Sequence, residues 1–369
     1  MRYFKGIDLS TLDEMEKLGA CYYDNGQKKD ILEIVSSYDV DTIRIRIWND
    51  PKSTDGKSYG AGNNDPDTSL KIAKEVTEAG LGVLLNFHYS DFWADPGKQI
   101  KPKAWMDLDK EELAKAVYDF TCNELMRYRD ANVRVNMIQI GNELTNGLLW
   151  PDGKTPSYKN IRDFVSAGLK AAHSIFPSVP LMIHLDNGGN NELYRTWFDN
   201  YFANDGAPFD VIGMSYYPFW HGSLEELSFN MKDIAERYGK DIVIAEVSMG
   251  FTMEDYASYE KLPANERKGY ATKPSLAEKV EYPMTKQGQA DFTLDLLNRI
   301  KAVPDKKGRG FFWWEGGWIP VPGSGWATQA SLEYMNDPGP CGNEWANQAL
   351  FDYDGNVLPA LRVIRDFKP

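Results

Sequence analysis

Long apolar runs and clusters of basic residues are missing from this 369-residue sequence. No stretch approaches the ~18 consecutive apolar residues that a membrane-spanning helix needs. The N-terminus, MRYFKGIDLS, lacks the apolar segment of a secretory signal, which fits a cytoplasmic protein or one whose leader has been removed. The net charge of −13 would repel nucleic acids and anionic membrane surfaces, so we expect neither as a partner.

Cysteines are also scarce, and several nucleotide-binding motifs are absent. Cys21, Cys122 and Cys341 lie far apart and form no CxxC pair, so neither a zinc site nor a disulfide scaffold is implied. No GxxxxGK[ST] phosphate loop occurs, and no GxGxxG turn follows the first strand-like segment. The sequence therefore offers no nucleotide-binding signature.

Aromatic residues, by contrast, are abundant, with 11 Trp, 20 Tyr and 17 Phe. A bulky core would account for them. Flat aromatic faces along a cleft would equally suit the apolar faces of sugars, and both interpretations stay open. Six tryptophans fall in loop-like stretches that contain Gly or Pro: Trp93, Trp105, Trp150, Trp220, Trp318 and Trp326.

Strand-like and helix-like segments alternate along the whole chain. This alternation favours a single (β/α)8 barrel domain spanning residues 1–369 over a doubly wound sheet. The predicted strands are Phe4–Ser10, Thr42–Trp48, Gly82–Tyr89, Met137–Glu143, Leu181–Asp186, Val211–Tyr217, Asp241–Val247 and Gly310–Glu315. The predicted helices are Lys28–Tyr38, Ser69–Ala79, Lys110–Ala131, Tyr158–Phe176, Leu193–Asn204, Leu224–Tyr238 and Lys286–Ala302.

Residues that alternate within the strands indicate a polar barrel interior. In TIRIRIW the isoleucines share one face, which leaves Arg44 and Arg46 pointing inward. A buried guanidinium without a partner is very costly, so we expect carboxylate or hydroxyl partners inside the barrel. Further candidates for the interior are Asp8, Ser10, Asn86, His88, Gln139, Glu143, His184, Asp186, Ser215, Tyr217, Glu246, Phe312 and Trp314.

The loops that follow the strands are long, whereas those that precede them are short. After the third strand comes SDFWADPGKQIKPKAW, while only Gly80 and Leu81 lead into that strand. Long loops on the carboxyl side alone would build a groove at one face of the barrel. A groove suits a polymer better than a small metabolite.

Two glutamates occupy similar places at strand ends. Glu143 closes MIQIGNE and Glu246 lies in DIVIAEV, on the fourth and seventh strands. Each could simply pair with Arg44 or Arg46. Two such carboxylates facing one another across the barrel mouth are, however, what glycosidic bond cleavage requires. A buried arginine and a hydroxyl beside Glu246 would keep it anionic and leave Glu143 as the proton donor.

Other polar residues allow more than one interpretation. Asn86 and His88 could bind a sugar, bind a carboxylate or serve only the core. His184 and Asp186 could bind a metal ion together with the two glutamates, but no HxH or HExxH pair accompanies them.

The ordered segments resemble one known family, glycoside hydrolase family 53, the endo-β-1,4-galactanases. The resemblance covers residues 4 to about 365 and implies (β/α)8 retaining glycosidases. The segments that carry it are KGIDLS, TIRIRIWNDP, LLNFHYSDFWADPGKQIKPKAW, QIGNE, SYYPFW, VIAEVSM and FFWWEGGWIP.

The resemblance implies a role for each site residue. Glu143 would be the acid/base and Glu246 the nucleophile, and Asn142 would bind the sugar 2-hydroxyl in the −1 subsite. Arg46 and Tyr217 would orient Glu246 and hold it ionised. The remaining substrate-binding candidates are His88 in the same subsite, Trp314 as its floor and Trp93 as a platform. Asn86, on the strand face that it shares with His88, is a further binding candidate that the residues themselves suggest.

The resemblance also implies a protein that acts on β-1,4-galactan, secreted or at the cell surface, without a cofactor. We expect a monomer. Some family members hold calcium in the loops after strands seven and eight, but Met253–Thr285 is rich in Lys, Glu and Tyr and predicts no such site. Two alternatives remain: a related enzyme for mannan or glucan, and a non-catalytic galactan-binding barrel.

Overall fold

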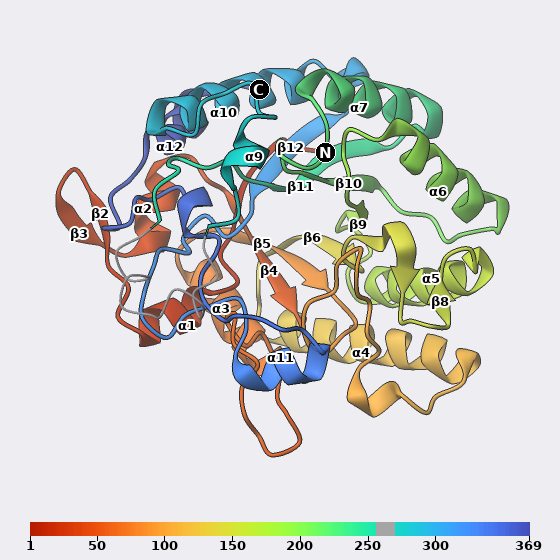
Figure 1. Ribbon diagram of the computed structural model, residues 1–369. Helices are drawn as coiled ribbons and strands as arrows, with labels where there is room; N and C mark the ends of the chain where they lie inside the picture. Colours follow the sequence, from red (N-terminus) through yellow and green to blue (C-terminus); the bar gives the residue numbers. More distant parts are fainter. Residues whose placement is uncertain (256–269) are drawn as a thin grey trace.

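The computed structural model describes residues 1–255 and 270–369, which build a closed barrel of eight parallel strands (Figure 1). Around the barrel the strands follow the order β1-β12-β11-β10-β9-β6-β5-β4. The (β/α)8 prediction is confirmed, and each strand begins and ends within three residues of its predicted bounds. The strands are β1 Phe4–Asp8, β4 Thr42–Ile47, β5 Gly82–Phe87, β6 Val135–Ile140, β9 Leu181–Leu185, β10 Val211–Tyr216, β11 Asp241–Val247 and β12 Gly308–Trp313.

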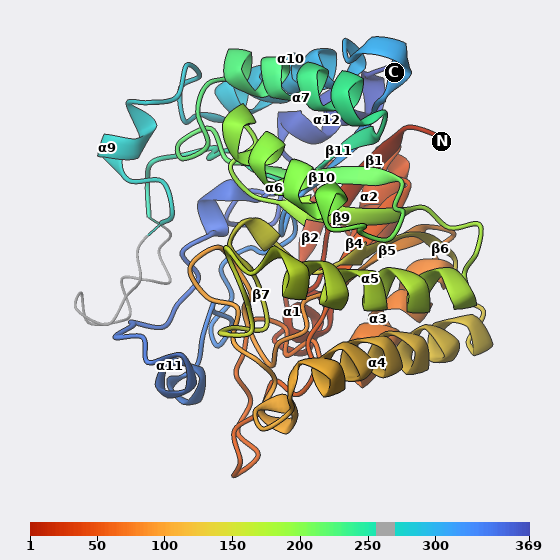
Figure 2. The same cartoon turned by 90° about the vertical axis from the view of Figure 1, so that its right-hand side faces the viewer.

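Helices surround the barrel and alternate with its strands (Figure 2). Their starts follow local chemistry: Asp109 and Ser223 each form a capping box, and Asp65 caps a helix that opens with Pro66. The longer helices are α3 Pro66–Glu78, α4 Lys110–Asp130, α5 Tyr158–Ile175, α6 Asn191–Ala203, α7 Leu224–Tyr238, α10 Lys286–Lys301 and α12 Pro359–Asp366. The shorter helices are α1 Leu12–Lys17, α2 Ile31–Ser37, α9 Pro274–Ala277 and α11 Gln329–Met335.

Two small hairpins interrupt the alternation. Strands β2 (Tyr22–Asp24) and β3 (Gln27–Lys29) form one of them, so α2 begins only at Ile31, three residues later than predicted. Strands β7 (Gly147–Leu148) and β8 (Gly153–Lys154) form the other, directly after β6. In the described part of the chain, no helix is both long enough and apolar enough to span a bilayer.

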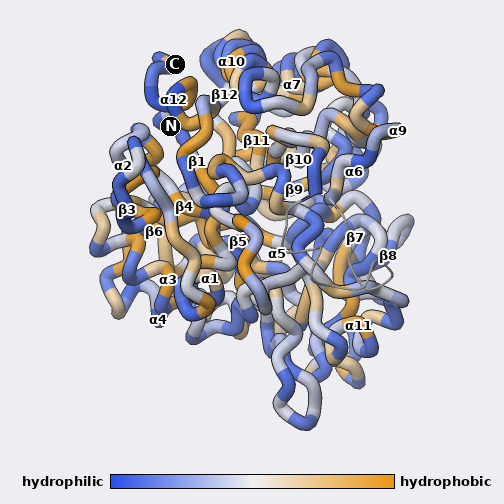
Figure 3. Tube along the Cα trace, turned by 60° about the vertical axis from the view of Figure 1, so that its left-hand side comes forward, coloured by the Kyte–Doolittle hydropathy of each residue, from blue (hydrophilic) through white to orange (hydrophobic). Residues whose placement is uncertain are grey.

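The barrel interior has an apolar lower layer and a polar upper layer. Hydrophobic residues gather on the strands inside the molecule, and hydrophilic residues lie mostly on the outer helices and loops (Figure 3). Above the apolar layer, toward the carboxyl ends of the strands, the inward side chains are charged or polar and almost fully buried. The apolar layer consists of Phe4, Leu84, Met137, Met182, Val211, Val243, Ala245 and Phe312.

Candidate active site

Glu143 lies just beyond the end of β6 in a strained turn. Its backbone is left-handed, with φ 49° and ψ 56°, a conformation that costs a non-glycine residue of order 1 kcal/mol and is concentrated at functional sites. Gly141 also has positive φ, and Gln99 holds the turn by donating from Nε2 to the Asn142 carbonyl at 2.8 Å. Ser215 Oγ donates to Glu143 Oε1 at 2.6 Å. The carboxyl group is therefore held in one orientation.

Glu246 reaches the barrel interior because β11 is irregular. Val243 and Ala245 already face inward, so simple alternation would point Glu246 outward. The register with β10 shifts so that Ser215 pairs with Glu246 rather than with Ala245. Such a bulge re-aims the following side chain, and here it directs Glu246 toward the other polar groups.

Two donors hold Glu246. Arg44 Nη2 donates to Oε1 at 2.7 Å, and the Tyr217 hydroxyl donates to Oε2 at 2.8 Å. The predicted buried arginine and hydroxyl beside Glu246 are therefore confirmed. The family resemblance implied Arg46 in this place, which is wrong: Arg44 is the arginine that binds Glu246.

The two glutamates differ in their affinity for a proton. Burial raises the pKa of Glu143 well above its ordinary range, and the charges of Glu246 and Asp186 raise it further. Burial also raises the pKa of Glu246, but the charge of Arg44 and the hydrogen bond from Tyr217 oppose this effect. A proton shared by the pair therefore resides on Glu143.

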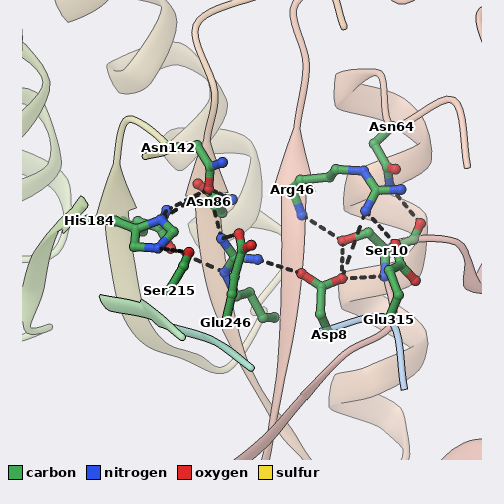
Figure 4. A network of polar contacts seen from close by, with 12 residues as sticks. Asp8, Ser10, Arg46, Asn64, Asn86, Asn142, His184, Ser215, Glu246 and Glu315 are labelled. Carbon is green, nitrogen blue, oxygen red and sulfur yellow. Dashed lines mark hydrogen bonds and ion pairs between the residues drawn. The ribbon is translucent and has the colours of Figure 1, made fainter. Parts of the chain in front are cut away.

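Arg44 connects Glu246 to the rest of the interior. Its guanidinium donates to Asp8 Oδ2 at 2.7 Å, to Gln139 Oε1 at 3.1 Å and to Asn142 Oδ1 at 2.9 Å. Its side chain is only 1% exposed. The expectation that the inward arginines have buried partners is confirmed, and Figure 4 shows the polar network that results.

Arg46 belongs to a neighbouring cluster in the same interior. It forms an ion pair with Glu315, which also accepts a hydrogen bond from Thr11 Oγ1 at 2.7 Å. The guanidinium carbon lies 4.9 Å from the ring centroid of Trp48 and 4.6 Å from that of Trp93. Arg46 thus supports an aromatic wall and still borders the cavity.

One cavity of ≈300 Å³ brings most of the predicted site residues together. Trp314 stands in its aromatic wall, with ring centroids 6.0 Å from Trp93 and 4.7 Å from Trp345. The predicted residues that border the cavity are Arg46, His88, Trp93, Asn142, Glu143, Tyr217, Glu246 and Trp314. Further lining residues, which were not predicted as site residues, are Arg44, Ala94, Asp95, Lys98, Trp318, Trp326, Asp337, Glu344 and Trp345.

Asn86 lies beneath this cavity and does not line it. Its Nδ2 donates to Asn142 Oδ1 at 3.1 Å and lies 3.0 Å from His88 Nε2. Trp48 Nε1 donates to His88 Nδ1 at 3.2 Å. Burial, together with the charges of Arg44 and Arg46, lowers the pKa of His88 well below its ordinary range, so this histidine is neutral.

The alternative of a metal site finds no support in the contacts of His184. Both ring nitrogens already face protein groups, with Nδ1 3.0 Å from Gln139 Nε2 and Nε2 2.9 Å from Ser215 Oγ. Within residues 1–255 and 270–369, no group of three or more His, Cys, Asp or Glu side chains could hold a metal ion. The stretch Met253–Thr285, considered for calcium, lies partly outside the described residues.

A closed (β/α)8 barrel with two buried carboxyl groups of unlike proton affinity beside an aromatic-lined cavity is the architecture of a barrel glycoside hydrolase. Comparison with known sequences agrees, because the profile of glycosyl hydrolase family 53 matches residues 4–364. The chain belongs to this family.

Individual relatives cover nearly the whole chain. An endo-beta-1,4-galactanase of Bacillus subtilis is 35% identical and is matched over 98% of this chain and 85% of the relative. An arabinogalactan endo-beta-1,4-galactanase of Humicola insolens is 33% identical, with 98% of each chain covered. The solved GH53 catalytic domain of Ignisphaera aggregans is 37% identical and superimposes with a TM-score of 0.90, covering 98% of this chain and 95% of that domain.

Proposed function

We propose that this protein is an endo-acting hydrolase that cleaves β-1,4-galactosidic bonds in galactan and in type I arabinogalactan with retention of configuration. Membership of family 53 and relatives that carry the galactanase name support the substrate. The unlike environments of Glu143 and Glu246 support the chemistry, and this asymmetry is the observation that carries the proposal.

The reaction proceeds in two displacements. Glu143 donates its proton to the glycosidic oxygen while a Glu246 oxygen attacks C1, so the leaving chain departs as an alcohol and a glycosyl ester forms. Glu143, now a carboxylate, takes a proton from water as the water oxygen attacks C1. Glu246 leaves as the carboxylate that Arg44 and Tyr217 stabilise. Retention requires a carboxyl separation of about 5 to 5.5 Å.

The remaining side chains bind the substrate. Asn142 Nδ2 donates to the Ala94 carbonyl at 2.9 Å and has a second N–H for the 2-hydroxyl of the sugar in the −1 subsite. His88 and Arg46 border this subsite, Trp314 forms its floor and Trp93 a neighbouring platform. Asn86 contributes to binding by holding the side chains of Asn142 and His88 in place.

No cofactor takes part in this mechanism, because two carboxyl groups and water supply every proton and bond. A polysaccharide is too large to enter a cell, so we propose that the protein works outside it. We also propose that it works as a monomer, since one chain contributes all the groups named above.

Proton NMR of the first products from β-1,4-galactan tests the proposal. The new reducing ends should appear as the β-anomer before mutarotation, and parallel assays on mannan and glucan should yield no product. The Glu246→Ala variant should bind galactan but release no product. Initial α-anomer would contradict the retaining mechanism, and a preference for mannan or glucan would contradict the substrate. If the wild type bound galactan but formed no product, the protein would be a non-catalytic galactan-binding barrel.

A further inference from the structure

We propose that a chain of hydrogen bonds through His184 and Ser215 fixes which oxygen of Glu143 carries the catalytic proton. The chain starts at Arg44, so one guanidinium orients both carboxyl groups: Glu246 directly and Glu143 through three intermediate side chains. This inference rests on the proposed role of Glu143 as acid/base, and His184 and Ser215 are positioning residues.

The direction of the chain is set at Gln139. Arg44 Nε can only donate, and it donates to Gln139 Oε1 at 3.1 Å. The amide nitrogen of Gln139 therefore faces His184 Nδ1, at 3.0 Å. The backbone N–H of Glu143 also points at this nitrogen, at 3.4 Å. Asn142 Oδ1 also lies near Nδ1, at 3.2 Å, but this oxygen already accepts from Arg44, Asn86 and Gln139. Because the backbone N–H of Glu143 can only donate and points at Nδ1, this nitrogen accepts, and the single ring proton of neutral His184 resides on Nε2.

The same direction continues to the acid/base. His184 Nε2 lies 2.9 Å from Ser215 Oγ, so it donates to the serine oxygen. The hydroxyl proton of Ser215 is then directed to Glu143 Oε1, 2.6 Å away. Glu143 Oε1 accepts this bond, and the proton of the acid form therefore resides on Oε2. Figure 4 shows His184 and Ser215 within the network that contains Asn142 and Glu246.

The hydrogen bonds from Arg44 to Glu143 keep this direction throughout turnover. Burial and the charge of Arg44 lower the pKa of His184 well below its ordinary range, so the ring stays neutral when Glu143 loses its proton. The bond from Ser215 lowers the pKa of Glu143 and thus partly offsets the effect of burial. Oε2 gives and takes the proton in both steps, while Oε1 accepts from Ser215 in both.

The tautomer of His184 can be measured without turnover. The protein contains only four histidines, so the imidazole region of a ¹H–¹⁵N correlation spectrum is sparse. The signals that disappear in His184→Gln belong to the His184 ring. Protein labelled with ¹⁵N-histidine should show His184 neutral with the proton on Nε2. A proton on Nδ1, or a charged ring, would overturn the inference, because Ser215 could then point away from Glu143.

A pair of serine variants tests the effect on chemistry. Ser215→Ala removes the bond that lowers the pKa of Glu143, so the alkaline limb of the kcat/KM profile should move to higher pH. We also expect kcat/KM at the optimum to fall about tenfold, the effect of losing one charge-assisted hydrogen bond. The other carboxylates that influence Glu143, from Glu246, Asp186 and Asp95, are unchanged in this variant.

Ser166→Ala is the matched control. Its buried hydroxyl on α5 accepts from the backbone N–H of Ala207 at 3.0 Å, away from the cavity. This variant should keep the wild-type profile. An unmoved alkaline limb in folded Ser215→Ala, or an equal shift in Ser166→Ala, would refute the inference. If Ser215→Ala does not fold, the wild-type histidine spectrum still decides.

The two proposals fail in different ways. Full activity of Glu143→Ala would refute the acid/base role, whatever the tautomer of His184. A histidine proton on Nδ1 in an otherwise retaining galactanase would refute only the hydrogen-bond chain.

Discussion

Replacing Arg44 with methionine should destabilise the protein and shift its pH dependence together. The guanidinium holds Asp8 and Glu246 at 2.7 Å each inside the barrel. Removing one partner of a buried ion pair costs about 3–5 kcal/mol. At an unfolding entropy of about 2.1 cal/mol/K per residue, 369 residues give about 0.8 kcal/mol/K. The melting temperature should therefore fall by about 4 to 6 °C.

The pH dependence follows from Glu246. Loss of Arg44 removes the main influence that lowers the pKa of Glu246, so this pKa rises in the folded state. A carboxyl group with a raised folded pKa stabilises the protein below its unfolded pKa, and this stability is lost as the pH rises through the folded pKa. The deficit in melting temperature should therefore be larger at pH 8 than at pH 5. The acid limb of kcat/KM should move to higher pH.

Differential scanning calorimetry and kinetics on galactan, each across this pH range, provide the measurement. Arg365→Met is the control, because Arg365 lies at the surface of α12 and pairs only with Asp366 among the described ion pairs. It should melt as the wild type does. If Arg44→Met melted like the control at both pH values, the buried network would not hold the barrel mouth together.

Two further substitutions separate binding from chemistry. Trp314→Ala removes the ring that lies between Trp93 and Trp345, so KM for galactan should rise about tenfold with a smaller change in kcat, and an unchanged KM would exclude Trp314 from the binding wall. Glu315→Gln removes the charge opposite Arg46 beneath that wall, so KM should rise while the pH profile stays in place. A shifted acid limb in Glu315→Gln would show instead that this cluster tunes the catalytic pair.

The barrel was predictable from sequence because short strand-like segments alternate with amphipathic helix-like segments along the whole chain. The last helix, α12, was not predicted, since a helix of eight residues that begins with a proline gives too short a periodic pattern. The hairpin of β2 and β3 was missed for a similar reason, because three-residue strands carry almost no alternation.

The site was predictable as a set of inward residues but not in its internal pairing. Alternation places Arg44 and Arg46 on one face, yet it does not say which reaches Glu246. Which arginine reaches Glu246 depends on its position along the barrel axis, and Arg44 lies in register with Asp8. It also depends on the bulge that turns Glu246 inward. Trp345 was missed because it follows β12 by more than thirty residues in a loop without a motif.

Covalent trapping of the nucleophile tests the central claim most directly. A 2-deoxy-2-fluoro-galactosyl donor with a good leaving group slows hydrolysis of the glycosyl ester, and mass spectrometry of the digested protein locates the label. The label should lie on Glu246 and be absent from Glu246→Ala. A label on Glu143, or on another residue, would contradict the assignment of these two carboxyl groups.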